Sequence, residues 1–297
     1  MNELFHHVGH LLLHSLIDTA KLLPFLFLTY LLMEFLEHRS GNATEKLLKR
    51  SGRVGPLVGG LLGALPQCGF SAAASGLYAG RVITVGTLIA VYLSTSDEML
   101  PILLSNGVSP LFLLAVLACK ILIGLAVGFL TDAALRLLRR KGREEPQIED
   151  ICERENCHCG NRFVLSALKH TAYIAIFLFV VNLCLNTAVE LIGEETLASF
   201  ILNRPVLGNL LASLVGLIPN CASSVVLTEL YLSGVIGLGC MFSGLLVNAG
   251  VGITVLLRNN RPVSDSLRIL AILWGAGLLF GLLIDLTPIA QWIGSLR

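Results

Sequence analysis

The sequence predicts an all-α polytopic membrane protein with two inverted five-element repeats, about ten transmembrane or re-entrant helices in total. Three observations lead to this fold class. Hydrophobic residues make up 55% of the 297 residues and charged residues 14%, whereas a soluble domain has roughly 25% charged residues. The mean hydropathy is +0.79. Long apolar runs recur along the chain, and each half has a break in an apolar hairpin at the same place.

Six apolar segments are long enough to cross a hydrocarbon core of about 30 Å. They span approximately residues 18–36, 82–104, 109–131, 163–187, 235–257 and 268–286. Four shorter apolar pieces, roughly 12 residues each, are too short to span comfortably as single helices. We interpret them as two broken hairpins that reach the membrane midplane, at about 54–65 with 69–80, and 205–218 with 222–233.

The chain therefore divides into four parts. An amphipathic N-terminal segment covers residues 1–17, the first membrane repeat 18–131, a polar loop 132–161, and the second, inverted repeat 162–290. The N-terminal segment lacks a basic region and a small-residue cleavage site, so we expect it to be retained in the mature protein.

The internal repeat appears when the sequence is shifted by 153 positions. Ten of the 26 positions between 61 and 86 are then identical in the two halves, whereas apolar composition alone would give roughly one in ten. The identities include residue types that are scarce in this chain: Pro66 and Pro219, Cys68 and Cys221, Ser71 and Ser224, Tyr78 and Tyr231.

The charged flanks predict the orientation. Lys and Arg cluster after the first span, at the start of the central loop and before the last span, whereas the link after 163–187 is acidic. Short basic flanks mark the cytoplasmic side, so the N-terminus is expected outside and the central loop in the cytoplasm. An odd number of elements per repeat makes the copies antiparallel. Inverted repeats with interrupted segments at matching positions are typical of the substrate site of a secondary transporter.

The two hairpin breaks are the first candidate substrate site. Proline removes a helix donor, and freed backbone groups at membrane depth need protein or a watery cavity around them. Helix ends at the membrane centre can hold a substrate with their dipoles. The candidate binding residues are Pro66, Gln67, Cys68 and Ser71 in the first half, and Pro219, Asn220, Cys221 and Ser224 in the second. Two ordinary tight turns with inert buried cysteines are the alternative.

A polar stretch inside the apolar segment 82–104 is the second candidate. It contains Thr95, Asp97 and Glu98, and the position that matches Thr95 in the second half is Asn248. Ionisable residues inside a membrane are costly and usually face a cavity or a partner. Asp97 or Glu98 could therefore bind a cation or carry a coupled proton. The alternative places both acids at the outer mouth.

Lys120 lies near the middle of the span 109–131, too far from either end for snorkelling alone to explain it. We expect an ion pair with Asp97 or Glu98, in which the substrate competes with Lys120 for the carboxylate. A static buried ion pair is the alternative. A cationic Lys120 without a partner would instead favour an anionic substrate.

The central loop is a candidate metal site. Thiolate and imidazole ligands suit zinc, copper(I) and other soft ions. The ligands would be Cys152, Cys157, His158 and Cys159. A flexible loop with reduced thiols is the alternative.

A second candidate metal site lies on the N-terminal segment. His6, His10 and His14 occur every fourth residue, which places them on one face of a helix. They could hold a divalent ion outside the membrane, and an interfacial helix surface is the alternative.

Four segments carry a resemblance to a known family: LLPFLFLTYLLMEFLEH, LPQCGFSAAASGLYAGRVITVGTLIAVYLSTSDEMLP, CERENCHC and IPNCASSVVLTELYLSGVI. Together they closely resemble the ten-transmembrane heavy-metal exporter family, a group also labelled arsenic efflux proteins or manganese transporters. The resemblance covers nearly the whole chain. It implies a bacterial inner-membrane permease that is related to arsenical permeases.

These patterns favour a proton-coupled secondary transporter that exports a heavy-metal or metalloid species by alternating access. The chain has no GxxxxGK[ST] motif for a built-in ATPase, no HExxH and no nucleophile elbow, so we do not expect an enzyme. A transporter of a small organic solute or anion is the main alternative, and a membrane enzyme or a non-transporting subunit is a third. The expected partners are the lipid bilayer and a small inorganic or organic solute, without nucleic acid. A homo-oligomer is left open. No cofactor is required, although a soft or divalent metal ion could be bound.

Overall fold

The computed structural model describes residues 54–65, 68–96, 98–138, 163–192 and 205–296, together with single positions between 16 and 31. Within these residues the regular structure is helical throughout. The N-terminal metal candidate and the central-loop metal candidate both lie outside them.

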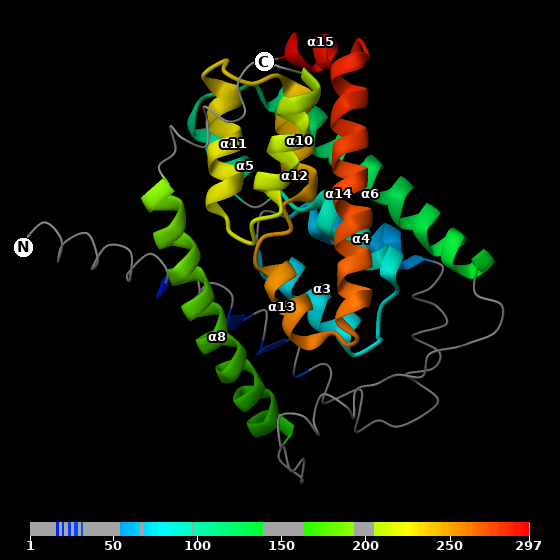
Figure 1. Cartoon of the computed structure of the whole chain (residues 1–297), viewed down its shortest axis with the longest axis vertical. Coiled ribbons are helices and arrows are strands. Elements are labelled where there is room, and N and C mark those ends of the chain that lie inside the picture. Colours follow the sequence, from blue (N-terminus) through cyan, green and yellow to red (C-terminus); the bar gives the residue numbers. More distant parts are fainter. Residues whose placement is uncertain are drawn as a thin grey trace, which may run out of the picture.

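The described helices comprise runs of short elements separated by the long helices of 24 to 30 residues (Figure 1). The first half contains an unlabelled helix at Val54–Gly63 followed by α3 (Cys68–Ala79), α4 (Val85–Ser94), α5 (Met99–Ser105) and α6 (Pro110–Leu138). The second half contains α8 (Phe163–Ile192), α10 (Pro205–Gly216), α11 (Ala222–Leu232), α12 (Leu238–Val247), α13 (Val251–Asn259), α14 (Val263–Leu286) and α15 (Ile289–Gly294).

Four helical stretches of the described chain are long and apolar enough to cross a membrane. They are Val85–Ser105, Pro110–Leu137, Leu238–Asn259 and Val263–Leu286. Each overlaps a predicted span, as does α8. Helices α6 and α14 also expose large apolar side chains, with Leu130 70% and Leu279 54% exposed. Such surfaces suit lipid rather than water, so the chain is a multi-pass membrane protein.

Two of the predicted spans differ from expectation because each is interrupted. The segment predicted at 82–104 consists of α4 and α5, and the segment predicted at 235–257 consists of α12 and α13. At the second interruption Gly250 has a φ of 52°, a left-handed conformation that glycine adopts at little cost. Neither interruption contains proline, which is why the apolar pattern alone suggested continuous helices.

The predicted end of the first repeat also differs. Helix α6 continues to Leu138, beyond the span predicted at 109–131 and into the segment predicted as the central loop. Its last turn carries Arg136, and a cation at a helix C-terminus is favourable. The basic start of the loop is therefore the end of the helix.

The two halves repeat the same close helix contacts at positions 153 residues apart. A Cβ atom on Gly86 of α4 would overlap the carbonyl oxygen of Gly128 on α6, and a Cβ atom on Gly239 of α12 would overlap that of Gly281 on α14. Small residues that let backbones meet are typical of helix packing in membranes. The same glycine pairs thus hold α4 against α6 and α12 against α14.

The repeat also extends to two carboxylates that sequence reasoning missed, one buried and one partly buried. Asp132 Oδ1 accepts a hydrogen bond from Gly86 N at 2.8 Å, and Asp285 Oδ1 accepts one from Gly239 N at 2.9 Å. Each carboxylate therefore satisfies an unpaired N–H in the first turn of a helix, where a negative charge is favourable. The signal was present in the sequence, because Asp285 lies 153 positions after Asp132.

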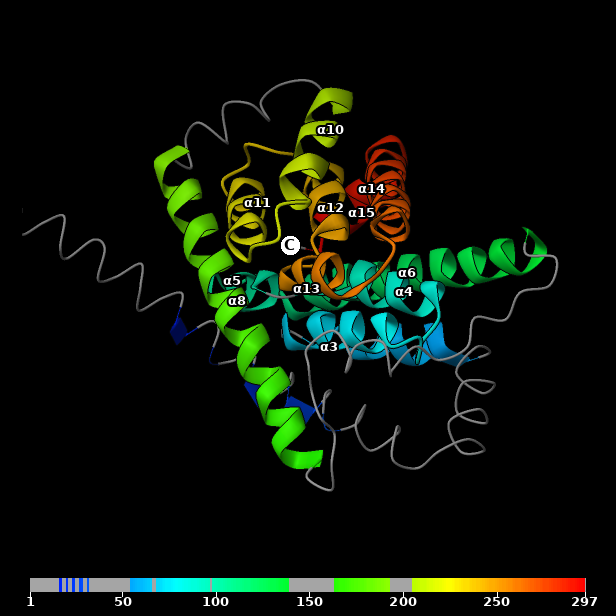
Figure 2. The same cartoon turned by 60° about the horizontal axis from the view of Figure 1, so that its bottom comes forward.

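The halves are joined by exchanged contacts between short helices. Helix α3 of the first half packs along α13 of the second, and α11 of the second half packs against α5 of the first. Figure 1 shows α3 and α13 at the lower end of the molecule and α5 and α11 nearer the upper end. In Figure 2, α3, α4 and α6 form a layer below α10, α11, α12 and α14. Helix α13 of the second half lies beside α3 of this lower layer.

Candidate functional site

The site is assembled where the two interrupted helices approach the two hairpin turns. Ser96 Oγ donates a 2.7 Å hydrogen bond to the carbonyl oxygen of Ala64, just before the first hairpin turn. In the second half, Asn248 Nδ2 donates a 3.1 Å hydrogen bond to Ser223 Oγ. Each interrupted helix is thus tied to the hairpin of its own repeat, by side chains that are at least 95% buried.

Asn248 shapes the second interruption as well as tying it to the hairpin. Its Oδ1 atom accepts a 2.9 Å hydrogen bond from Gly250 N, the local turn that asparagine side chains commonly make. The side chain is 2% exposed. The structure therefore places this predicted residue at the centre of the site, with both ends of its amide used.

Lys120 connects the two interrupted helices. Its Nζ atom donates hydrogen bonds to the carbonyl oxygen of Thr95 and, at 2.9 Å, to that of Leu245. Thr95 follows the last residue of α4, and Leu245 lies in the last turn of α12. Helix C-termini carry a partial negative charge, so an ammonium group is well placed between them. Lys120 is 1% exposed, which makes this a buried cation held by both halves.

The expected ion pair of Lys120 with Asp97 or Glu98 stays a prediction. Asp97 lies outside the described residues. Glu98 immediately precedes α5 and is partly exposed. The carbonyl contacts of Lys120 could not be foreseen, because backbone ligands have no signature in the sequence.

A hydroxyl cluster joins α3 to α13. Ser75 Oγ lies 2.6 Å from the carbonyl oxygen of Ser71 and 2.8 Å from that of Gly252. Tyr92 Oη lies 2.6 Å from Ser75 Oγ and donates a 3.1 Å hydrogen bond to the same Gly252 oxygen. All of these side chains are fully buried. The predicted residue Ser71 thus contributes a carbonyl, while Ser75 and Tyr92 were missed.

The spacing of Ser71 and Ser75 was the available signal for this cluster. The matching positions in the second half are Ser224 and Thr228, and Thr228 Oγ1 donates a 2.7 Å hydrogen bond to the carbonyl oxygen of Ser224. Both hairpins therefore carry a hydroxyl four residues after the serine.

The second hairpin turn is held by its own polar groups. Asn220 Oδ1 accepts a 3.3 Å hydrogen bond from Ala222 N, and Ser224 Oγ donates a 2.7 Å hydrogen bond to the carbonyl oxygen of Cys221. Asn220 is 6% exposed, and Cys221 is a partly buried thiol. Pro219 immediately precedes Asn220 in this turn, so these predicted residues are brought together in one turn.

The first hairpin turn is described only in part. Pro66 and Gln67 lie outside the described residues, and Cys68 is described only as the first residue of α3. The predicted pairing of the two cysteines around one substrate therefore stays a prediction.

The predicted metal sites are likewise untested. Cys152, Cys157, His158, Cys159, His6, His10 and His14 all lie outside the described residues. Across the described ranges, no group of three or more His, Cys, Asp or Glu side chains could hold a metal ion.

Comparison with known families decides the class of the protein. The chain matches the ArsP_2 family, which is described as "Putative, 10TM heavy-metal exporter", over residues 10–165 and again over residues 161–293. The chain belongs to this family. The two matched regions of this exporter family meet where the polar central loop leads into α8. No curated protein and no solved structure matches the chain.

Proposed function

We propose that this exporter-family member is a secondary-active transporter that moves a heavy-metal or metalloid species out of the cell across the bacterial inner membrane. The observation that carries the proposal is the meeting of two interrupted helices, one from each half, at the buried ammonium of Lys120. Discontinuous helices at a repeat interface form the substrate and ion sites of many secondary transporters.

The halves are proposed to be inverted repeats that rock against each other in alternating access. The matched glycine contacts and the matched carboxylates support a common unit. The basic flanks support an outside N-terminus and a cytoplasmic central loop. In that orientation α3 and α13 lie at the cytoplasmic end, and α5 and α11 lie at the outer end.

The cargo is proposed to bind between the hairpin turns, with Cys68 and Cys221 as soft ligands for a thiophilic species. Lys120 then couples cargo to conformation, because a cationic cargo and the ammonium compete for the same negative helix ends. Its carbonyl partners also weaken the argument for an anionic cargo, which depended on a cation without partners. Asp97 or Glu98 is proposed to carry the coupled proton.

The test is export from cells and into inverted membrane vesicles. Metal content is measured for arsenite, Mn²⁺, Zn²⁺ and Cd²⁺, with and without the protein, and with a proton gradient imposed or collapsed. Export of one of these species that depends on the gradient is expected. Unchanged accumulation and tolerance across the whole set would refute the proposal.

A cysteine pair tests the ligands separately. The double variant Cys68→Ser, Cys221→Ser should lose export of a thiophilic cargo, while Cys184→Ser on α8, whose thiol is exposed, serves as the control. Transport that survives the double variant but is inhibited by small organic anions would instead indicate an organic solute or anion carrier.

A further inference from the structure

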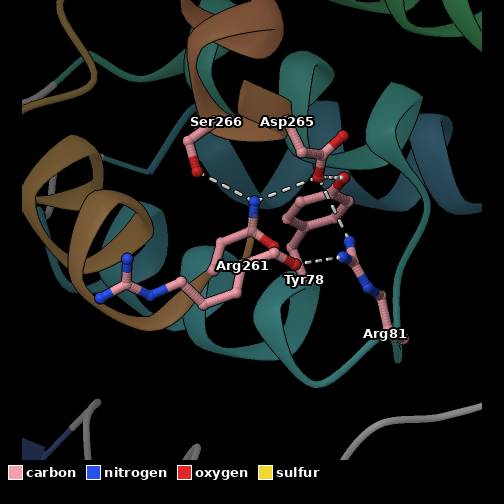
Figure 3. Close-up of polar contacts among 6 residues, drawn as sticks. Tyr78, Arg81, Arg261, Asp265 and Ser266 are labelled. Atoms are coloured by element: carbon pink, nitrogen blue, oxygen red, sulfur yellow. Dashed lines mark hydrogen bonds and ion pairs between the residues drawn. The ribbon is translucent and has the colours of Figure 1, made fainter. Parts of the chain in front are cut away.

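A polar cluster at the lower end of the molecule joins the two halves through one carboxylate (Figure 3). Asp265 Oδ2 accepts hydrogen bonds from Tyr78 Oη at 2.6 Å and from Asn260 Nδ2 at 3.1 Å. It also forms an ion pair with Arg81 Nη1 at 3.3 Å, and the two side chains are only 21% and 11% exposed. A charged pair this well covered, with further hydrogen bonds on the carboxylate, is stronger than a surface salt bridge.

The residues of this cluster come from different repeats. Tyr78 and Arg81 lie at the end of α3 and in the turn after it, whereas Asn260 caps the end of α13 and Asp265 lies in the first turn of α14. Arg81 Nη2 also donates a 3.0 Å hydrogen bond to the carbonyl oxygen of Arg261 in the link between α13 and α14. The cluster therefore fastens the C-terminal end of α3, away from the hairpin turn, to the end of α13 and the first turn of α14.

The backbone of Arg81 indicates that its side chain is needed there. Arg81 has a φ of 58°, the one non-glycine residue with positive φ among the described residues. The matching residue in the second half is Gly234, with a φ of 77°. Both turns have the same hydrogen bond, Val82 N to Leu77 O at 2.8 Å and Val235 N to Leu230 O at 2.9 Å. Arginine costs more than glycine in this conformation, so the ion pair offsets a local strain.

The opposite end of the molecule has an aromatic contact at the same position. Tyr231 matches Tyr78, and Phe112 matches Asp265, each 153 positions away. The rings of Phe112 and Tyr231 are stacked, with centroids 5.9 Å apart and planes at 8°. Both residues are buried. The same place in the repeat thus holds a polar contact at one end and an apolar contact at the other.

We propose that these two contacts are the gates of the transport pathway: a polar gate, Tyr78–Arg81–Asp265, and an aromatic gate, Phe112–Tyr231. Both join the hairpin helix of one repeat to the start of the long helix that follows the interrupted helix of the other, α3 to α14 and α11 to α6, and these elements must separate if the repeats rock. Both gates are closed in the conformation described here. The assignment of the polar gate to the cytoplasmic end rests on the proposed function and its orientation.

Different chemistry gives the two gates different sensitivities. The polar gate depends on one negative charge, so Asp265→Asn removes its ion pair while leaving an oxygen that can accept from Tyr78. The aromatic gate depends on apolar burial and ring contact, so Phe112→Ala opens it while Phe112→Leu retains most of the buried area. Opening one gate should leave the other closed.

Hydrogen–deuterium exchange of the full chain in lipid nanodiscs tests the proposal without any cargo. Val82 N and Val235 N are matched probes of the two ends, because each closes the same turn. Asp265→Asn should raise exchange of the peptide with Val82 by about tenfold, the change expected when about 1.4 kcal/mol of charge-assisted bonding is lost. The peptide with Val235 should change less than about twofold. Phe112→Ala should give the reverse pattern.

Two further variants keep the test decisive. Arg81→Lys retains the charge and should leave exchange near the wild-type value. Arg81→Gln removes the ion pair from the other side and should give the increase expected for Asp265→Asn, so it replaces that variant if the asparagine variant folds poorly. Equal increases at both ends, or no change at the polar gate in either variant, would overturn the proposal. Export is measured separately: altered exchange in a protein that exports none of the metals would refute the proposed function and leave the gates standing.

Discussion

Replacement of Lys120 by methionine separates a functional ammonium from a merely structural one. The substitution keeps a long unbranched side chain and removes the charge that contacts the ends of α4 and α12. Two charge-assisted hydrogen bonds contribute about 1.5–3 kcal/mol each. Burial of an ammonium costs several kcal/mol, and the residue is 1% exposed. The opposing terms largely cancel, so the free energy of unfolding should change by less than about 2 kcal/mol.

Export should respond far more strongly than stability. If Lys120 favours one arrangement of the two interrupted helices over the other, a loss of about 1.4 kcal/mol of this free-energy preference lowers export by about tenfold. The matched control is Leu273→Met, because Leu273 occupies the same position of the second repeat and is fully buried. An exchange of leucine for methionine usually costs less than about 1.5 kcal/mol, so this control should fold and export normally.

The assay combines export into inverted vesicles with thermal unfolding of the purified protein in lipid. Lys120→Met that exports as well as Leu273→Met would show that the ammonium has no part in transport. Lys120→Met that fails to fold, beside a folded Leu273→Met, would refute the cancellation of burial and hydrogen bonding. The first result would remove Lys120 from the proposed site, and the second would show that its ammonium is needed for folding.

Three other substitutions test the packing and the interruptions. Gly239→Ala should lower thermal stability markedly, because the new methyl group overlaps a backbone carbonyl of α14. The control Gly275→Ala meets no atom within 4 Å and should be neutral or stabilising. Equal melting temperatures of the two variants would contradict the close contact. Asn248→Ala removes the hydrogen bonds to Ser223 and Gly250 and should reduce export, and wild-type export would contradict its role. Tyr92→Phe should cost about 1 kcal/mol in unfolding experiments, and an unchanged midpoint would show that its hydroxyl contact with α13 is dispensable.

The general architecture was accessible from the sequence because apolar length and an internal repeat are global signals. Segments such as 235–257 and 268–286 are recognisable by length alone, and the family to which the chain belongs is described as a "Putative, 10TM heavy-metal exporter". Interruptions are harder to see. The break between α12 and α13 depends on a side-chain turn at Asn248 and a left-handed Gly250, which are common residues with no unusual composition around them.

The candidate site was predicted less completely, for a physical reason. Sequence reasoning looks for side-chain partners, and the carboxylate partner that it gave Lys120 stays a prediction. The backbone carbonyls that its ammonium contacts have no signature in the sequence. Similarly, Asp132 and Asp285 act on backbone N–H groups of neighbouring helices. Pairing each intramembrane charge with its counterpart 153 positions away would have found the two aspartates, and would have shown that Lys120 has only Leu273 as its equivalent.

The charges that break the repeat symmetry have a common consequence for transport. A transporter whose two ends were chemically identical would favour neither orientation, because each change at one end would be matched at the other. Here Lys120 is matched by Leu273 and Asp265 by Phe112. The contact at one end therefore depends on charge, and the contact at the other end depends on apolar burial. A bound cation or an arriving proton interacts with buried charge far more strongly than with stacked rings. If the proposed ion-coupled transport holds, the charged positions are where cargo and driving ion act on one orientation selectively. The matched glycines and aspartates then preserve the frame that both orientations share.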